Sequence, residues 1–328
     1  MKENNDVINK MILDLSICIP AYNYAQYLPF AIESCLATDF DFELVVVDNC
    51  SKDHTNQLKS KYVHDNRVKW YTNTETLPLV QNWNHTVSLG SRKYVKLLLA
   101  DDYLEPNFFT LFQEAITKYP DQAIYGHLIK IIDKDNVLQN IGVPYSKSEK
   151  YFLVKGVRYI QMKLQSIARF KETSCNFFLK EKWAEIGGFD EKFSFSFDLV
   201  FNSTLAFNYG GCLISEHAAC LRRHSQADNL NKKPDLSVKE MNIIVTMLFE
   251  NLGSEIRKTD FLFGKSMLQY RIIELLFQRF KKKPFDSILF FVKHISYFSS
   301  VMSYPYTLST IIRKYKTKDV QQQIENFK

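Results

Sequence analysis

The feature that most constrains the fold is an alternation of short, β-branched apolar runs with amphipathic segments along the first hundred residues. The runs Leu15–Pro20 and Glu43–Asp48 end at a proline or a carboxylate, as buried parallel strands commonly do. Between them, residues 24–37 carry apolar side chains at helical spacing. The alternation continues to residue 99. It predicts an α/β fold in which a mostly parallel sheet is flanked by helices.

Polar residues follow the predicted strands, at the edge where sheets of this kind bind ligands. The loops are Ala21-Tyr22-Asn23, Asp48-Asn49 and Asp101-Asp102. Each loop alone has a simpler explanation, because Asp, Asn and Ser cap helix N-termini. Three polar loops on one edge instead indicate a binding site.

Composition excludes several classes of protein. Hydrophobic residues make up 46% of the chain and charged residues 24%, which is typical of a folded globular protein. Only 10 of 328 residues are glycine, and neither G-x-G-x-x-G nor a Walker A sequence occurs, which argues against a Rossmann dehydrogenase or a P-loop NTPase. No nucleic-acid-binding motif is visible. The six cysteines lack C-x-x-C spacing, so we expect free thiols.

Four motifs occur in order along the chain. They are Ser16-Ile-Cys-Ile-Pro-Ala-Tyr-Asn23, Val45-Val-Val-Asp-Asn-Cys-Ser-Lys-Asp-His-Thr55, Leu97-Leu-Leu-Ala-Asp-Asp-Tyr-Leu-Glu-Pro106 and Gly187-Gly-Phe-Asp-Glu191. Together, over residues 14–230, they strongly resemble the family 2 glycosyltransferases, whose GT-A fold is Rossmann-like. The resemblance implies an inverting transfer of a sugar from a nucleotide-sugar donor to an acceptor hydroxyl.

The resemblance also implies where the nucleotide binds. In relatives the residue matching Asp48 hydrogen-bonds the base, and residues around Pro20, Ala21 and Tyr22 line the base pocket. Because a carboxylate accepts a hydrogen bond from the imide N–H of uracil, UDP is favoured over GDP. Asn82-Trp83-Asn84 resembles a helix in one branch of the family, which implies that Asn84 approaches the nucleotide. Ordinary helix packing is the alternative for this segment.

A divalent cation beside the diphosphate would offset the negative charge that builds on the leaving group. The resemblance implies that Asp101 and Asp102 hold Mg²⁺ or Mn²⁺, with Asp101 also close to the nucleotide. Leu99 stands at the first position of the family's D-x-D pattern, so two carboxylates remain. Arg222-Arg-His224 resembles a late Arg-x-His element. It implies that Arg222 neutralises the diphosphate and that His224 ligates the metal or contacts phosphate, with a solvated basic loop as the alternative.

The catalytic base is placed by counting from Gly187-Gly-Phe-Asp-Glu191. The family has Glu-Asp where Phe197-Asp198 stand here, which implies that Asp198 removes the acceptor's proton. Apolar neighbours on both sides predict a raised pKa for Asp198. Capping of the following helix is a compatible alternative role. Since Phe197 replaces the glutamate, we expect acceptor binding to differ from that of relatives.

The C-terminal part differs in character from the rest. We predict a catalytic domain over residues 1–234 and a helical, basic region over residues 235–328. Residues 257–328 hold 14 Lys and Arg against 5 Asp and Glu, and their most apolar stretch is interrupted by Lys293. We therefore expect this region to lie on an anionic membrane surface. Packing on the catalytic domain or a dimer contact is the alternative.

The N-terminus lacks the basic start and apolar stretch of a secretory signal, so we expect a cytoplasmic protein at the inner face of the membrane. By analogy with the family, the acceptor is a saccharide or lipid-linked oligosaccharide of polysaccharide, O-antigen or capsule biosynthesis. Two alternatives remain. A non-catalytic nucleotide-sugar-binding scaffold is suggested by Leu99 and Phe197 at usually acidic positions. A sugar nucleotidyltransferase would need a glycine-rich loop after the first strand, which is missing.

Overall fold

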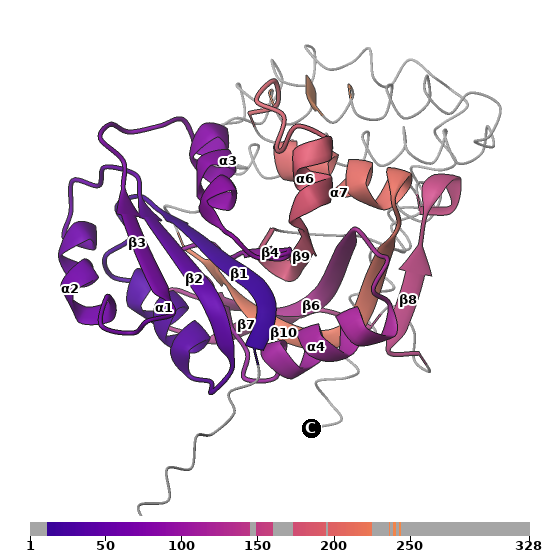
Figure 1. The fold of residues 1–328 in the computed structure, drawn as a ribbon, viewed down its shortest axis with the longest axis horizontal. Coiled ribbons are helices and arrows are strands. Elements are labelled where there is room, and N and C mark those ends of the chain that lie inside the picture. The colour runs from indigo at the N-terminus through magenta and orange to yellow at the C-terminus, as the bar shows by residue number, and fades with distance from the viewer. Residues whose placement is uncertain are drawn as a thin grey trace, which may run out of the picture. The chain divides into compact units, whose positions relative to one another are not determined.

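The computed structural model describes residues 12–144, 149–159, 173–194 and 196–224, with the isolated positions 236, 239, 240 and 243. The chain divides into two compact units, residues 1–156 with 169–227, and residues 157–168 with 228–328. Almost all described residues belong to the first unit, which Figure 1 draws in colour. The predicted boundary near Pro234 and nearly all of the predicted basic region lie outside the described residues.

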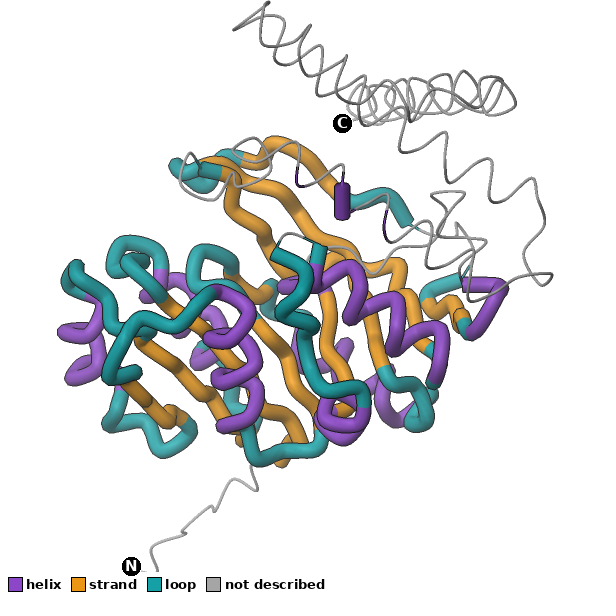
Figure 2. Tube along the Cα trace, turned by 90° about the horizontal axis from the view of Figure 1, so that it is seen from above, coloured by secondary structure: helices purple, strands orange, loops and turns teal. Residues whose placement is uncertain are grey.

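Ten strands among the described residues form one sheet. They are β1 (Ile12–Ala21), β2 (Asp41–Asp48), β3 (Val68–Thr72), β4 (Tyr94–Leu97), β5 (Tyr103–Leu104), β6 (Ile124–Asp133), β7 (Leu138–Ile141), β8 (Tyr151–Val154), β9 (Asn176–Leu179) and β10 (Gly211–Arg223). The strand order is β3-β2-β1-β4-β9-β6-β10-β5, with β7 beside β6 and β8 beside β10. Figure 2 shows the strands side by side, with helices along the sheet.

The pairing of β1 with β2 and β4, of β2 with β3 and of β6 with β10 is parallel. The short strands β5, β7, β8 and β9 pair antiparallel. This confirms the predicted α/β fold with a mixed, mostly parallel sheet. The carboxyl ends of β1, β2 and β4 meet at one edge because these strands run in the same direction.

Helices cover both faces of this sheet. They are α1 (Leu28–Leu36), α2 (Lys59–Tyr62), α3 (Leu79–Leu89), α4 (Phe108–Lys118), α6 (Lys180–Glu185) and α7 (Phe197–Asn208), with short 3₁₀ turns η1 (Thr55–Leu58) and η2 (Thr173–Cys175). Helices α1 and α4 supply apolar side chains to the main buried cluster on one face. Helices α3, α6 and α7 lie on the other side of the sheet (Figure 1).

Helix α1 is shorter than the segment predicted for it, and an arginine distant in the sequence donates hydrogen bonds to its C-terminal end and the turn that follows. The guanidinium of Arg67, just before β3, donates to the carbonyl oxygens of Leu36, Thr38 and Phe40 at 3.3, 2.7 and 3.2 Å. The last carbonyl groups of a helix have no partner within the helix itself. Here Arg67, 27 to 31 residues further along the chain, supplies one such donor to Leu36 and also binds the carbonyl groups of Thr38 and Phe40 just after the helix.

A buried carboxylate, Glu43, joins β2 to its neighbours. It accepts hydrogen bonds from Lys69 Nζ at 2.5 Å, from the Ser91 amide at 2.6 Å and from the Ser16 hydroxyl. Burial alone would raise the pKa of Glu43, but these bonds outweigh burial and lower the pKa from 4.5 to about 2. The stabilisation from this lowered pKa is present above pH 4.5 and is lost as the pH falls from 4.5 to about 2.

We expect Glu43→Gln to remove this acid-dependent stability. The urea midpoint of the variant should fall below that of the wild type at pH 7, and the gap should narrow as the pH drops below 4.5. Urea unfolding between pH 7 and pH 3 measures the gap. Glu181→Gln changes a carboxylate that is 81% exposed and should follow the wild type at every pH. A gap that stays constant with pH would contradict the expectation.

Candidate active site

The loops after β1 and β2 are joined by hydrogen bonds at the carboxyl edge of the sheet. Asp48 is buried and its Oδ1 accepts from the Ser51 amide at 3.0 Å. The Asn23 carboxamide oxygen accepts from the Lys52 amide at 2.8 Å, and the Asn23 amide donates to Ser51 Oγ at 2.9 Å. Both loops are therefore held in one conformation beside Asp48.

Pro20 and Ala21 are the last residues of β1 and their side chains are buried, whereas Tyr22 is 38% exposed. Of the three residues predicted to line the base pocket, Tyr22 is thus the one whose ring is accessible. That these residues contact the base stays a prediction.

Asn49, which follows Asp48, closes a network that the sequence does not reveal. Its carboxamide pairs with the backbone of Leu77 in both directions, at 2.9 Å each. Asn73 Nδ2 donates to Asn49 Oδ1 at 2.8 Å and to Asn82 Oδ1 at 3.1 Å. Asn82 lies on α3, so this network ties the loop after Asp48 to that helix. No sequence motif marks Asn49, Asn73 and Asn82 as partners.

The predicted metal loop is held by the end of β10. Asp102 is 1% exposed and its Oδ1 accepts from the Arg222 amide at 2.9 Å. Nε of Arg222 donates to the carbonyl oxygen of Asp101 at 3.0 Å. Strand β10 therefore fixes both aspartates of the loop after β4, although more than 100 residues separate them in the sequence.

Asp101 and His224 meet directly. Nε2 of His224 lies 3.0 Å from Oδ2 of Asp101, and their side chains are 4% and 9% exposed. The rings of Tyr24 and Tyr27 lie against the His224 imidazole, with centroids 5.9 and 4.9 Å away. The predicted ligands Asp101 and His224 thus come together although 123 residues separate them, and the two aromatic rings fix the imidazole.

Arg222 is 2% exposed, and its guanidinium is occupied by the protein. Besides the Asp101 carbonyl, it donates to the carbonyl oxygen of Asp133 at 3.2 Å and lies over the rings of Tyr27 and Phe30. Of the three guanidinium nitrogens, the buried Nη2 is the one that finds no acceptor among the described residues. The structure shows Arg222 shaping the loop, and its contact with a diphosphate stays a prediction.

Asp198 lies in the first turn of α7 and is half-buried, and its Oδ1 accepts from the Leu199 amide at 2.7 Å. The N-cap residue of α7 is Ser196, so the capping alternative for Asp198 is wrong. Asp198 instead places its negative charge within the first turn, and its catalytic role stays a prediction. Both polar atoms of the Asn84 side chain bond to the backbone of Phe189. The structure therefore shows packing against the Gly187–Glu191 segment for Asn84, and contact with a nucleotide stays a prediction.

A buried lysine supports the strand that leads into the metal loop. Lys96 of β4 is fully buried, and its Nζ donates to the Ser174 carbonyl at 2.5 Å and lies 2.9 Å from His127 Nε2. The Ser174 hydroxyl in turn accepts from the Leu99 amide at 3.0 Å. Burial lowers the pKa of Lys96 from 10.5 to about 7. Burial also holds the pKa of His127 well below its usual value, so its Nε2 is an acceptor for the lysine.

We expect Lys96 to make the folded protein more stable as the pH rises above 7. Between about pH 7 and pH 10.5 the unfolded chain holds a proton on Lys96 that the folded protein has lost, so the wild type gains stability as the pH rises. Lys96→Met should lack this gain. Urea unfolding at pH 7, 8 and 9 measures it, with Lys61→Met as the control, since Lys61 is 59% exposed. Parallel curves for wild type and Lys96→Met would rule the effect out.

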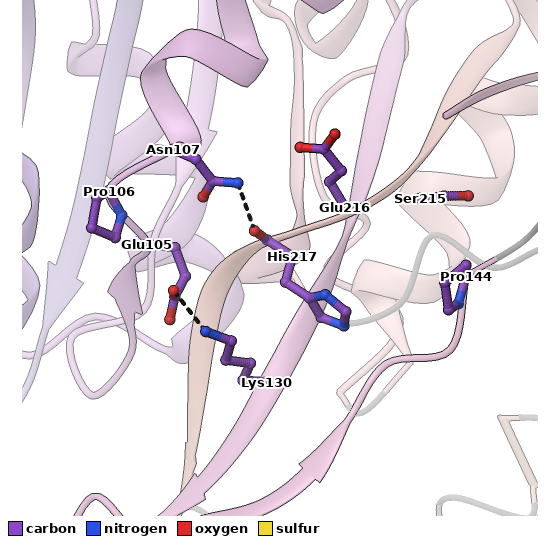
Figure 3. A pocket seen from close by; sticks show the side chains of 8 residues that line it. All are labelled: Glu105, Pro106, Asn107, Lys130, Pro144, Ser215, Glu216 and His217. Carbon is purple, nitrogen blue, oxygen red and sulfur yellow. Dashed lines mark hydrogen bonds and ion pairs between the residues drawn. The ribbon is translucent and has the colours of Figure 1, made fainter. Parts of the chain in front are cut away.

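A cavity of about 560 Å³ lies outside this cluster (Figure 3). It is lined by Glu105, Pro106, Asn107, Lys130, Pro144, Ser215, Glu216 and His217. Its polar groups are already engaged: Glu105 pairs with Lys130 at 2.9 Å, and Asn107 donates to the His217 carbonyl at 3.0 Å. None of the residues predicted to bind donor or metal lines it.

Three other observations bear on the predictions. Within residues 12–224 as described, no cluster of three or more His, Cys, Asp or Glu is arranged to hold a metal ion. No helix in the described part of the chain is both long and apolar enough to cross a membrane. All six cysteines are free, which confirms the prediction of free thiols.

Several known proteins are similar to this chain. It is 24% identical to the hyaluronan synthase of Pasteurella multocida over 75% of its own length, and 31% identical over 29% of its length to an uncharacterized glycosyltransferase of Mycoplasma pneumoniae. It spans about a quarter of the former protein and a third of the latter.

Among solved structures, Staphylococcus aureus TarS in complex with UDP-GlcNAc matches 90% of this chain and 79% of that one, with a TM-score of 0.58 and 17% identity. This similarity shows the same fold. The sequence model for "Glycosyl transferase family 2" matches residues 16–185, which is more than half of the chain. With its motifs gathered at one edge of such a sheet, the chain belongs to glycosyl transferase family 2.

Proposed function

We propose that this protein is an inverting glycosyltransferase that uses a UDP-sugar donor. The observation that carries the proposal is the cluster formed by Asp101, Asp102, Arg222 and His224 at the carboxyl edge of a family 2 fold. Carboxylate and imidazole groups beside the loop that carries Asp48 suit a nucleotide diphosphate and its cation. The structural similarity to a protein solved with UDP-GlcNAc supports a uridine nucleotide.

The residues present fit a divalent cation. Asp101 Oδ2 and His224 Nε2 lie 3.0 Å apart, which is close enough for both atoms to ligate one ion, and both side chains are almost buried. Two protein ligands of this kind leave coordination positions open for donor oxygens and suit Mg²⁺ or Mn²⁺. When bound, the cation would supply positive charge against the leaving diphosphate. Asp102, the other predicted metal ligand, also keeps the loop against β10, because its Oδ1 accepts from the Arg222 amide.

In the proposed reaction, Asp48 accepts a hydrogen bond from the uracil imide and the accessible Tyr22 ring lies beside the base. Asp198 takes the proton from the acceptor hydroxyl as that oxygen attacks the anomeric carbon. The bond to the UDP oxygen breaks as the new glycosidic bond forms, so UDP leaves with the electron pair and the configuration inverts.

The acceptor we propose is a growing saccharide, free or lipid-linked, of a surface polysaccharide. Relatives named as hyaluronan and chondroitin synthases support this class, although the chain covers only part of each. We further propose work at the cytoplasmic face of the membrane, with residues 257–328 on anionic lipid. The full chain should then sediment with phosphatidylglycerol vesicles at low salt and not with phosphatidylcholine vesicles.

A panel of UDP-sugars tests the function. UDP release from UDP-glucose, UDP-GlcNAc, UDP-GalNAc and UDP-glucuronic acid is measured with Mn²⁺, with and without p-nitrophenyl glycosides of the same sugars. We expect one donor to turn over faster than the rest, and an acceptor glycoside to raise the rate. Tight UDP binding without turnover on any donor and acceptor pair would favour the non-catalytic scaffold instead.

A further inference from the structure

Helix α3 is bound to the Gly187–Glu191 segment through Asn84. Asn84 Nδ2 donates to the Phe189 carbonyl at 2.9 Å, and the Phe189 amide donates to Asn84 Oδ1 at 2.8 Å. The two bonds use the backbone N–H and C=O of Phe189 and both polar atoms of the Asn84 carboxamide. One side chain therefore fixes both the place and the orientation of this backbone segment, across 105 residues of sequence.

The turn that presents Phe189 is built to lie against Asn84. Gly187 and Gly188 have φ angles of +79° and +78°, a backbone conformation that residues other than glycine rarely adopt. A Cβ on Gly188 would lie 2.6 Å from Asn84 Oδ1 and 3.1 Å from Trp183 Nε1. Glycine is thus required both for the backbone conformation and for the close approach of the carboxamide.

An aromatic cluster carries this attachment to α7. Trp83, next to Asn84, meets Phe189 edge-on at 5.6 Å and Phe197 at 4.9 Å between ring centroids. Phe189 also packs on Phe201 of α7 at 4.3 Å. Phe197 and Phe201 are buried and lie on either side of Asp198 in the sequence. The position of Phe189 therefore sets where the first turn of α7 lies, and with it Asp198.

We propose that Asn84 is a positioning residue for the base, acting on Asp198 through the backbone of Phe189 and the aromatic cluster. This inference rests on the proposed function of Asp198. It gives the Asn82-Trp83-Asn84 segment two tasks. Asn82 bonds to Asn73 in the network beside Asp48, and Asn84 holds the segment before α7. The helix therefore links the base-binding side of the donor site to the residue that deprotonates the acceptor.

A double-mutant cycle tests this assignment, using UDP release from the fastest donor and acceptor pair of the panel. Asn84→Ala should lower kcat roughly tenfold or more, since small misplacements of reacting groups are costly in rate. The Kd for UDP, measured by calorimetry, should stay within about twofold, because both polar atoms of the Asn84 side chain bond to Phe189. A loss confined to UDP affinity would overturn the positioning role in favour of the predicted contact of Asn84 with the nucleotide. In an Asp198→Asn background, the same change should alter kcat by less than about twofold, because the group being positioned is already gone.

Ser88→Ala is the matched control on the same helix, since Ser88 is exposed and, within the described part of the chain, its hydroxyl bonds only to the His85 carbonyl. It should behave as wild type. Asn84→Asp serves as a second variant if alanine prevents folding. It keeps an acceptor for the Phe189 amide and loses the donor to the carbonyl, so kcat should fall, and a urea titration shows that the variant is folded.

Equal losses of kcat from Asn84→Ala in both backgrounds would overturn the positioning role and leave Asp198 as the base. Wild-type kcat in Asn84→Ala would do the same. Near-normal turnover in Asp198→Asn alone would instead overturn the proposed base, and the positioning role with it. The two failures are thus distinguishable.

Discussion

Asp198→Asn should lower the transfer rate by roughly 100-fold or more, the scale expected when a general base is lost. An asparagine carboxamide keeps the oxygen that accepts from the Leu199 amide, so this hydrogen bond in the first turn of α7 is retained. It cannot accept the acceptor's proton at neutral pH. The loss should therefore appear in kcat, with the Kd for UDP and the urea midpoint close to wild type. Steady-state UDP release with saturating donor measures it.

Asp190→Asn is the matched control. Asp190 is an exposed acid eight positions before Asp198, and its carboxylate bonds to the Lys192 amide at 2.9 Å. If it serves only the turn, its variant should keep at least about half of the wild-type rate. A similar loss in both variants would point to damage in this segment, and turnover near wild type in Asp198→Asn would remove Asp198 from the mechanism.

The second large effect is expected at the metal loop. Asp101→Ala should weaken Mn²⁺-dependent UDP binding by at least about tenfold, because few protein ligands remain once Asp101 no longer faces His224. Asp102→Ala should also weaken it, through release of the Arg222 amide that fixes the loop. The contact with His224 makes Asp101 the more sensitive position.

Calorimetry of UDP with Mn²⁺ and with EDTA makes the comparison. Without metal, the wild type and Asp101→Ala should bind UDP similarly, while Asp121→Ala, at an exposed position after α4, should behave as wild type throughout. Equal UDP affinity with and without metal in the wild type and both variants would show that the two aspartates serve only the loop structure.

The sequence predicts those parts of the fold that depend on local pattern. Apolar runs ending in polar residues located β1, β2 and β4, and the direction of parallel strands then placed Asp48 and Asp101 on one edge. Strand β10 escaped prediction because Glu216 and His217 interrupt its apolar run. The structure explains the interruption, since the pairing of β10 with β6 is irregular between Ile214 and Ala219. The two polar residues therefore hide the 13-residue strand β10 from a search for continuous apolar runs.

Site residues that act through distant partners were the least predictable. The Arg222-Arg-His224 motif predicts a contact with the diphosphate, but it does not indicate that the guanidinium is buried and bonds to backbone carbonyls. Lys96 stands in an apolar run, where a charge gives no hint of its partners His127 and Ser174. Such roles depend on contacts that only the tertiary structure makes.

The hydrogen bonds from Arg67 to the end of helix α1 have a consequence for how the chain folds during synthesis. Residues 12–48 form a strand, a helix and a strand, yet the carbonyl groups of Leu36, Thr38 and Phe40 receive the Arg67 hydrogen bonds only after Arg67 has left the ribosome. Local signals for a helix stop, such as a glycine after Leu36, are missing from residues 37–40. We therefore expect the β1–β3 segment to become resistant to protease in one step, once the residues before β3 have emerged, rather than strand by strand.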